Sequence, residues 1–282
     1  MKQHLMKPVL AKQEDGTIVI TITIPAADVK KQVEKEIEAY VANAEISGFR
    51  KGKAPRKLVE EKINKEQLKE AALKKLLPDA YMKAMQTLNL KPLITPHIHV
   101  ETLAEDKDWV FTATTCEAPE ITLTGYKDAI QKITAKSKII LPGKENEKQE
   151  PQLEEIVKAL LAHVKITLPK VLVEREVERL LAQLLDEIKS LGLSLDQYLA
   201  STGKTVEQLK TEYTQKAEHD LAFELALQAI AEAENIVVEQ AEIEEAIMKA
   251  VSPEEKAHLE KNRYMLASIL RQQKTLDFLK SL

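Results

Sequence analysis

The spacing of apolar residues changes along the chain, and this change constrains the fold more than any other feature. Residues 17–24, TIVITITI, place isoleucine at every second position, which is the period of a strand with one buried face. Beyond Pro151 the apolar residues recur with the period of amphipathic helices instead. The sequence therefore predicts an α+β N-terminal domain followed by an all-α C-terminal domain.

The N-terminal domain is predicted to hold a small antiparallel sheet and several helices. Two strands flank a polar turn at 14–16, and two more strand-like runs occupy 97–103 and 109–116. Helical spacing covers 25–47 and 66–89. The stretch between these helices, GFRKGKAP, predicts a helix-loop-helix tip.

We expect three segments along the chain: a domain over 1–116, a linker over 117–150 and a helical domain over 151–282. The linker is expected because periodic signals weaken after Glu117 and a charged run with glycine and proline follows. In the helical domain, we predict that 153–166 and 253–281 are each one helix. Three positions carry the pattern of a capping box, a reciprocal pair of hydrogen bonds at a helix start: Ser194, Thr205 and Ser252.

Composition places the chain among intracellular globular proteins. A single cysteine, Cys116, rules out an internal disulfide framework and suits a reducing compartment. The sequence has no run of about 18 apolar residues, so we expect no membrane contact and a cytoplasmic location. The net charge is +3 for residues 1–150 and −7 for residues 151–282, so only the first half is suited to an anionic partner.

The residues that most resemble a catalytic or metal site do not form one. Thr202-Gly-Lys-Thr205 ends like a phosphate-binding loop, but the required earlier glycine is replaced by Tyr198 and the surroundings are helical. His97 and His99 share one strand face without a third ligand at a suitable spacing, and Cys116 has apolar and threonine neighbours. We therefore predict no catalytic residue, no metal and no cofactor.

The loop GFRKGKAP, residues 48–55, is the most informative local motif. Its glycines and proline suit a turn, but a solvated turn does not explain why Phe49 stands among cations, where it exposes apolar area. Residues 50–57 contain five cations and no acid. This pattern indicates a surface for RNA or an acidic protein, with the aromatic ring as an anchor.

The loop resembles the ribosome-binding signature of the trigger factor family, whose pattern is Gly-Phe-Arg-x-Gly-Lys-x-Pro. The match is complete at the specified positions, and it lies between two helices as in the family. The resemblance implies docking on a large-subunit protein and the adjacent ribosomal RNA beside the exit tunnel. The residues implied in ribosome binding are Gly48, Phe49, Arg50, Lys51, Gly52, Lys53 and Pro55.

The helical half resembles the same family in segments such as VLVEREVERLLAQLL (171–185) and ALQAIAEAENIVV (226–238). The resemblance implies helical arms around a cradle that shelters unfolded or nascent polypeptides without ATP. The apolar stretch 221–230 and the last helices place apolar residues on more than one face, so some of them are candidates for client contact. The candidates are Phe223, Met248, Val251, Leu259, Tyr264 and Met265.

One part of the family pattern is missing. Trigger factors usually carry a prolyl isomerase domain between these two regions, whereas residues 117–150 form a short stretch whose only aromatic residue is Tyr126. We therefore expect no isomerase activity and no other enzymatic activity.

Two other classes of protein stay open at the level of sequence. A general RNA-binding protein would use the cations of residues 50–57, although the acidic second half argues against it. A non-chaperone helical scaffold would bury its apolar helix faces internally or in an oligomer. The sequence leaves the oligomeric state open, with a homodimer among the options.

Overall fold

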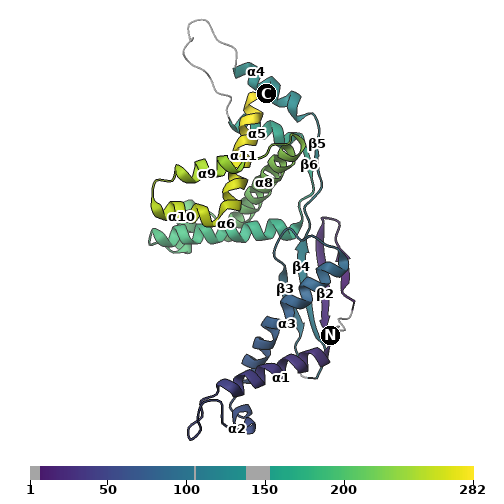
Figure 1. The fold of residues 1–282 in the computed structure, drawn as a ribbon. Coiled ribbons are helices and arrows are strands. Elements are labelled where there is room, and N and C mark those ends of the chain that lie inside the picture. Colours follow the sequence, from purple (N-terminus) through teal and green to yellow (C-terminus); the bar gives the residue numbers. More distant parts are fainter. Residues whose placement is uncertain (1–6, 105, 138–152) are drawn as a thin grey trace. The chain divides into compact units, whose positions relative to one another are not determined.

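The computed structural model describes residues 7–104, 106–137 and 153–282, and the chain forms two compact units (Figure 1). Unit 1 comprises Met1–Ala118 and Pro169–Leu172, and unit 2 comprises Pro119–Leu168 and Val173–Leu282. The predicted fold class is confirmed: a four-stranded antiparallel sheet with helices precedes a mostly helical region.

Unit 1 is built on a sheet with the strand order β1-β2-β4-β3. Its elements are β1 (Val9–Lys12), β2 (Thr17–Ile24), α1 (Ala26–Asn43), α2 (Arg56–Glu60), α3 (Lys65–Leu88), β3 (His97–Thr102) and β4 (Trp109–Cys116). The alternating isoleucines of β2 are buried, as the period-two pattern predicts. They pack with Trp109 and Phe111 of β4 against α3, so one face of the sheet carries the core.

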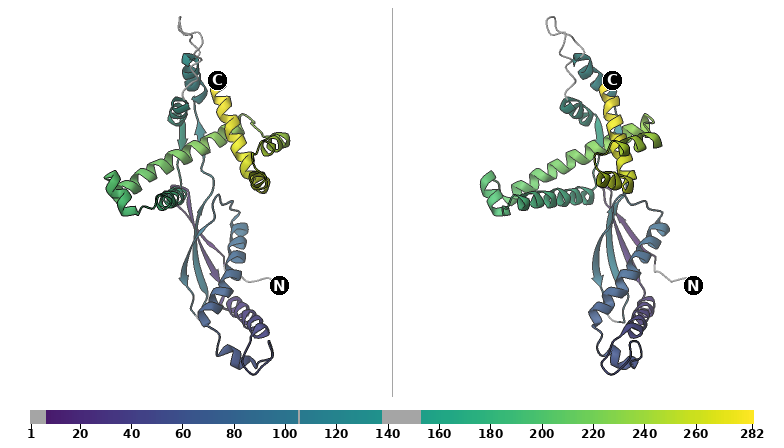
Figure 2. Two further views of the ribbon diagram at one scale, coloured as in Figure 1. Left: turned by 90° about the vertical axis from the view of Figure 1, so that its left-hand side faces the viewer. Right: turned by 60° about the vertical axis from the view of Figure 1, so that its left-hand side comes forward.

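Helix α1 projects past the end of the sheet and leads into the loop that precedes α2 (Figure 2). Its sheet-proximal end is fixed by Val29, which is part of the core. Farther along, Glu36 accepts a hydrogen bond from Gln32 and pairs with Lys75 of α3, with 2.8 Å between Nζ and Oε1. Glu36 is buried, and the Lys75 ammonium holds the pKa of this carboxyl below its usual range.

Unit 2 is built around α8, which is buried on more than one face. Its elements are β5 (Ile121–Leu123), α4 (Tyr126–Ser137), α5 (Leu153–Ala162), β6 (Val164–Ile166), α6 (Lys170–Ser190, of which the first three residues belong to unit 1), α7 (Leu195–Thr202), α8 (Val206–Ala233), α9 (Gln240–Met248), α10 (Pro253–Lys261) and α11 (Arg263–Ser281). The core joins α8 with α4, α5 and α11 through buried residues such as Ile130, Leu160, Ile230 and Leu279.

Helices α6 and α8 lie side by side and are joined by the short α7 (Figure 2). Leu184 and Ile188 of α6 pack on Leu209 of α8 at the α7 end of this pair. The predicted capping boxes at Ser194 and Thr205 are both present, and they fix where α7 and α8 begin.

The described part of the stretch that we predicted as a linker contains a strand, β5, and a helix, α4. Residues 121–123 pair with β6, and Tyr126 and Ile130 of α4 enter the core of unit 2. The Tyr126 hydroxyl donates to Glu234, and burial together with this carboxylate raises the pKa of Tyr126 to about 12. The physical reason for the difference is local: apolar residues at 126, 130 and 133 give α4 a helical stripe. The predicted linker residues 138–150 lie outside the described residues.

Two of the predicted helices are interrupted. The helix expected over 153–166 ends at Ala162, because the following residues pair with β5, so unit 2 also contains a two-stranded sheet. The helix expected over 253–281 breaks at Asn262 into α10 and α11. Ser252 caps α10 as predicted, but the Glu255 carboxylate accepts from the Val251 N–H and not from Ser252.

The Glu36–Lys75 pair gives a test of how α1 is attached to α3. We expect Glu36→Gln to lower the free energy of unfolding of unit 1 by about 1 kcal/mol at pH 7, because the hydrogen bond that the buried Glu36 carboxylate accepts from the Lys75 ammonium is weakened. Because the folded-state pKa of Glu36 is depressed, this contribution is present above the unfolded pKa of about 4.3 and is lost as pH falls through the folded value.

Urea unfolding followed by Trp109 fluorescence measures this effect, because the only tryptophan of the chain lies in the core of unit 1. Glu38→Gln on the exposed side of α1 is the matched control. An equal stability loss for both variants, or a Glu36→Gln effect that is the same at pH 7 and pH 3, would contradict the assignment.

Candidate functional site

The loop between α1 and α2 is an ordered turn whose side chains face outward. The Phe49 N–H donates to the Ile46 carbonyl at 3.0 Å, and the Lys53 N–H donates to the Arg50 carbonyl at 2.9 Å. Gly48 and Gly52 both have positive φ angles, of 88° and 69°. The loop backbone is therefore held in two successive turns while its side chains stay free to meet a partner.

Gly52 attaches this loop to the end of α1. Its N–H donates to the Ala44 carbonyl at 3.0 Å, and a Cβ at this position would lie 2.4 Å from the Ala42 carbonyl oxygen. A Cβ at Gly48 would meet no heavy atom within 4 Å. Gly52 is thus required for a close backbone approach, whereas Gly48 is required only for its backbone conformation.

The loop exposes one aromatic ring beside several cations. The Phe49 side chain is exposed, and so are Arg50, Lys51 and Lys53. Lys51 lies 3.4 Å from the Glu45 carboxylate. Within the described part of the chain, Arg50 and Lys53 form no ion pair. The structure thus brings the candidate residues together, with Pro55 directly before α2.

Arg56, which we counted among the cations of the basic cluster, has a structural role. Its guanidinium contacts Glu34 of α1 and Glu60 of α2, so it ties the two helices together behind the loop. These carboxylates raise the pKa of Arg56 above its usual range. The i,i+4 spacing of Arg56 and Glu60 is visible in the sequence, but the Glu34 contact depends on the turn between the helices.

Four of the six candidate client-binding residues are exposed in unit 2. Val251 and Tyr264 are each 96% exposed, Met248 is 75% exposed and Met265 is 53% exposed. They lie at the end of α9, before α10 and at the start of α11. Leu259 is half-buried. Phe223 differs from the expectation, because it packs against the core of unit 2 on α8.

A second group of exposed apolar residues was not singled out from the sequence. Leu185 of α6, Leu191 and Leu193 of the turn after α6, and Val206 at the start of α8 are all exposed. They surround the turns that flank α7. A signal exists in the sequence, since two leucines flank the helix-ending Gly192 and a β-branched residue follows the capping Thr205.

The residues that we considered for metal or phosphate binding lie in turns, strands and helix caps. Gly203 ends α7 with a left-handed backbone and Thr205 caps α8, as expected for a turn. His97 and His99 are exposed on β3, and Cys116 is buried. Among the described residues, no group of three or more His, Cys, Asp or Glu could hold a metal ion. The same residues contain no helix long and apolar enough to cross a membrane.

The chain thus combines an α+β unit, which carries an ordered aromatic and basic loop, with a helical unit that exposes apolar residues. Two family models match the chain: the bacterial trigger factor protein over residues 6–147 and the trigger factor C-terminus over residues 131–281. Each covers at least half of the chain, so the chain belongs to the bacterial trigger factor family. The two ranges overlap, and no isomerase domain lies between them.

Individual relatives agree with this family. The trigger factors of Staphylococcus aureus strains JH9 and Newman are each 31% identical to the chain over 153 residues, which is 54% of this chain and 33% of theirs. The chain thus matches about a third of the length of these curated relatives. One solved structure is similar to this chain with a TM-score of 0.64, and the match covers 98% of this chain and 99% of the solved chain. It comes from work on promiscuous substrate recognition in folding and assembly activities of the trigger factor chaperone. At 13% identity it shows a shared fold.

The two glycines of the loop offer a matched pair of variants. We expect Gly52→Ala to displace the loop from the end of α1, because its new Cβ would overlap the Ala42 carbonyl oxygen. Gly48→Ala carries a similar positive-φ strain without that overlap. Amide hydrogen exchange at Phe49 and Lys53, whose N–H groups close the turns, should accelerate much more in Gly52→Ala. Equal acceleration in both variants would refute the importance of the close approach.

Proposed function

We propose that this protein is an ATP-independent cytoplasmic chaperone that docks at the ribosomal exit tunnel and shelters nascent polypeptides. Membership of the trigger factor family supports this function. The single observation that carries the docking step is the exposed Phe49 beside Arg50 and Lys53, on a loop whose backbone is fixed by Gly52. The partner is the large ribosomal subunit, through a protein of that subunit and adjacent ribosomal RNA.

The physical basis of docking is an aromatic anchor combined with cations. Burial of one aromatic side chain in a partner pocket removes apolar area from water, and cations that lack partners in the free protein pair with phosphates or carboxylates. Because the loop is already ordered, little conformational entropy is lost on binding. Gly48, Gly52 and Pro55 shape the loop, while Phe49, Arg50, Lys51 and Lys53 make the contacts.

Ribosome cosedimentation tests docking directly. We expect Phe49→Ala with Arg50→Ala and Lys51→Ala to weaken ribosome binding by more than about tenfold, because an anchor and two charges are lost together. The fold should be unchanged, since these side chains are exposed.

The matched control is Tyr40→Ala with Lys31→Ala and Lys35→Ala, which removes an equally exposed aromatic and two exposed cations from α1. It should bind ribosomes like the unchanged protein. Full binding by the loop variant, or equal loss in both variants, would exclude the loop as the docking site.

We further propose that the exposed apolar residues of α9–α11 contact clients. Met248, Val251, Tyr264 and Met265 gather exposed apolar surface on α9–α11, which contact one another, and flexible methionines adapt to varied partners. Phe223 is left out of this group, because it packs on the core of unit 2, and the half-buried Leu259 can only contribute at its edge.

Suppression of client aggregation, followed by light scattering without nucleotide, tests this surface. We expect Met248→Gln, Val251→Thr, Tyr264→Gln and Met265→Gln together to lose most of the suppression while keeping the helical content. Val9→Thr, Met82→Gln and Leu93→Gln replace similarly exposed apolar residues of unit 1 and should have little effect. If both sets of substitutions leave suppression intact, clients bind elsewhere.

We propose that the protein acts without prolyl isomerase activity, because its matched regions are only the N- and C-terminal parts of the family. A proline-containing tetrapeptide should isomerise at its uncatalysed rate in the presence of the protein. Saturable acceleration would show an active site that the family comparison does not predict.

A further inference from the structure

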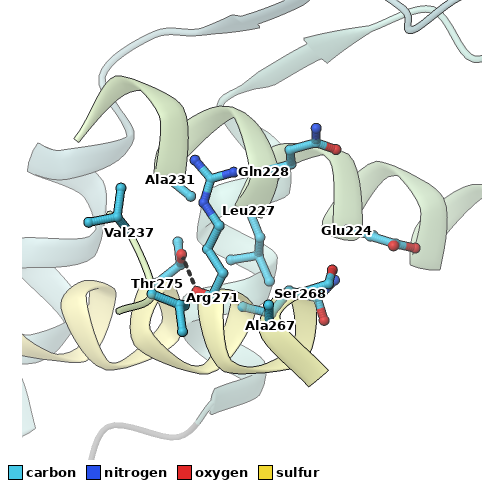
Figure 3. A pocket seen from close by; sticks show the side chains of 11 residues that line it. Glu224, Leu227, Gln228, Ala231, Val237, Ala267, Ser268, Arg271 and Thr275 are labelled. Atoms are coloured by element: carbon cyan, nitrogen blue, oxygen red, sulfur yellow. Dashed lines mark hydrogen bonds between the residues drawn. The ribbon is translucent and has the colours of Figure 1, made fainter. Parts of the chain in front are cut away.

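A cavity of 520 Å³ lies between α8 and α11 in unit 2 (Figure 3). Its volume falls within the range of about 300–1,000 Å³ that is typical of ligand pockets. It does not include any of the exposed apolar residues that we assign to client contact. The cavity is therefore a feature that the proposed function does not yet use.

Small side chains on the two facing helices create the space. Ala231 of α8 and Ala267 and Ser268 of α11 line it, where larger residues would let the helices fill the gap. Leu227 and Ala231 are buried and form an apolar floor. The buried Thr275 hydroxyl donates to the Arg271 carbonyl, so it presents no unmet polar group to the cavity. The floor thus favours an apolar side chain.

The end wall of the cavity is held in place by hydrogen bonds from α11. The Arg271 Nε donates to the Ile236 carbonyl at 2.9 Å, and the Lys274 ammonium donates to the Val237 carbonyl at 2.8 Å. Lys274 also pairs with Glu242 of α9. The Ile236 N–H donates to the Ala231 carbonyl at 2.8 Å. A wall fixed in this way binds a ligand without a large ordering cost.

Among the described residues that line the cavity, Arg271 alone carries a positive charge. Only its Nε is engaged: across the described residues, its two terminal amino groups have no hydrogen bond or ion pair. In Figure 3 its guanidinium lies beside Ala231 and Gln228, and Glu224 lies well away from it toward the other end of α8. The cavity therefore has a cationic side, an apolar floor and an acidic end.

We propose that this cavity binds a segment of client polypeptide in which an aliphatic side chain adjoins an aspartate or glutamate. The aliphatic group occupies the floor at Leu227 and Ala231, and the carboxylate pairs with the terminal amino groups of Arg271. Charge complementarity selects this occupant, because a half-buried guanidinium with unused donors binds a carboxylate more strongly than a neutral acceptor. Glu224 disfavours a second carboxylate at its end and so orients the segment.

This inference rests on the proposed chaperone function, but it adds a selective subsite to it. The acidic helical half, with a net charge of −7 over residues 151–282, repels acidic segments in general. The cationic side of the cavity, at Arg271, allows an acidic residue beside an aliphatic one to be held despite the surrounding negative charge. The proposed clients thus include acidic segments, which the negative charge of the rest of unit 2 would otherwise repel.

Binding of three acetylated and amidated peptides to the full chain tests the proposal. The peptides share a polar background and differ in a central pair: Asp-Leu, Asn-Leu or Asp-Ala. Chemical-shift titration should show that the Asp-Leu peptide binds about tenfold more tightly than either of the others, because each of the others loses one of the two contacts. Equal affinity for all three peptides would overturn the proposal.

Variants locate the binding in the cavity. Ser268→Trp places a large ring at the mouth and should abolish binding of the Asp-Leu peptide, whereas Gln273→Trp, on the same helix but outside the lining, should leave it unchanged. Arg271→Gln should remove the preference for Asp-Leu over Asn-Leu while it retains an amide donor for the Ile236 carbonyl. Undiminished binding by Ser268→Trp, or a stronger preference for a peptide with a free C-terminal leucine carboxylate, would refute the assignment.

Failure of this inference is distinguishable from failure of the proposed function. If the unchanged chain suppresses aggregation and does not discriminate among the peptides, the chaperone function stands and the cavity assignment falls. If it discriminates among the peptides and never suppresses aggregation, the cavity binds peptides as proposed and the chaperone function falls.

Discussion

Burial of α8 on several faces is the interaction on which unit 2 depends. Leu221, Leu225, Leu227 and Ile230 are all buried, and the helix contacts α4, α5 and α11 in one core. This enclosure is confined to the C-terminal half of α8, since residues 206–220 are largely exposed, and the enclosed half is the part that packs with α4. The same helix forms one wall of the α8–α11 cavity. Its short side chains there, such as Ala231, keep the cavity open without exposing the core.

In unit 1 the corresponding constraint is to keep an exposed loop ordered. Exposure alone gives a mobile turn, because cations in water gain little from their neighbours. Here the order comes from the backbone: Gly52 approaches the end of α1 more closely than any side chain would allow, and Arg56 joins α1 to α2 behind the loop. Phe49 can then stay exposed without becoming disordered. The residues that shape the loop, such as Gly52 and Arg56, are therefore different from those that are exposed for contact, such as Phe49.

The sequence predicted those features whose signals are local. The period of β2 located a buried strand face, and the Ser194 and Thr205 boxes located two helix starts, because each depends on residues within a few positions. It did not predict β5 and β6, whose pairing joins residues more than 40 positions apart in three-residue strands. The sequence also did not predict the contact between Arg56 and Glu34, because this contact forms only when the loop reverses the chain direction between α1 and α2.

Of the candidate site, the loop was recognisable because its residues are consecutive. The candidate client residues were recognised in part, since four of the six are exposed, whereas the cavity was not predicted. Phe223 and Met248 have the same apolar character in the sequence, but one packs on the core and the other is exposed, and only the packing of neighbouring helices separates them. The cavity is even harder to predict from the sequence, because it is the space that small side chains on two facing helices leave unfilled. Exposed flexible residues of α9–α11 suit many partners weakly, while a fixed cavity with one cationic side and one acidic end suits few partners more tightly. Under the proposed function, the protein would hold varied clients through the exposed residues and would retain longest those whose segments also fill the cavity.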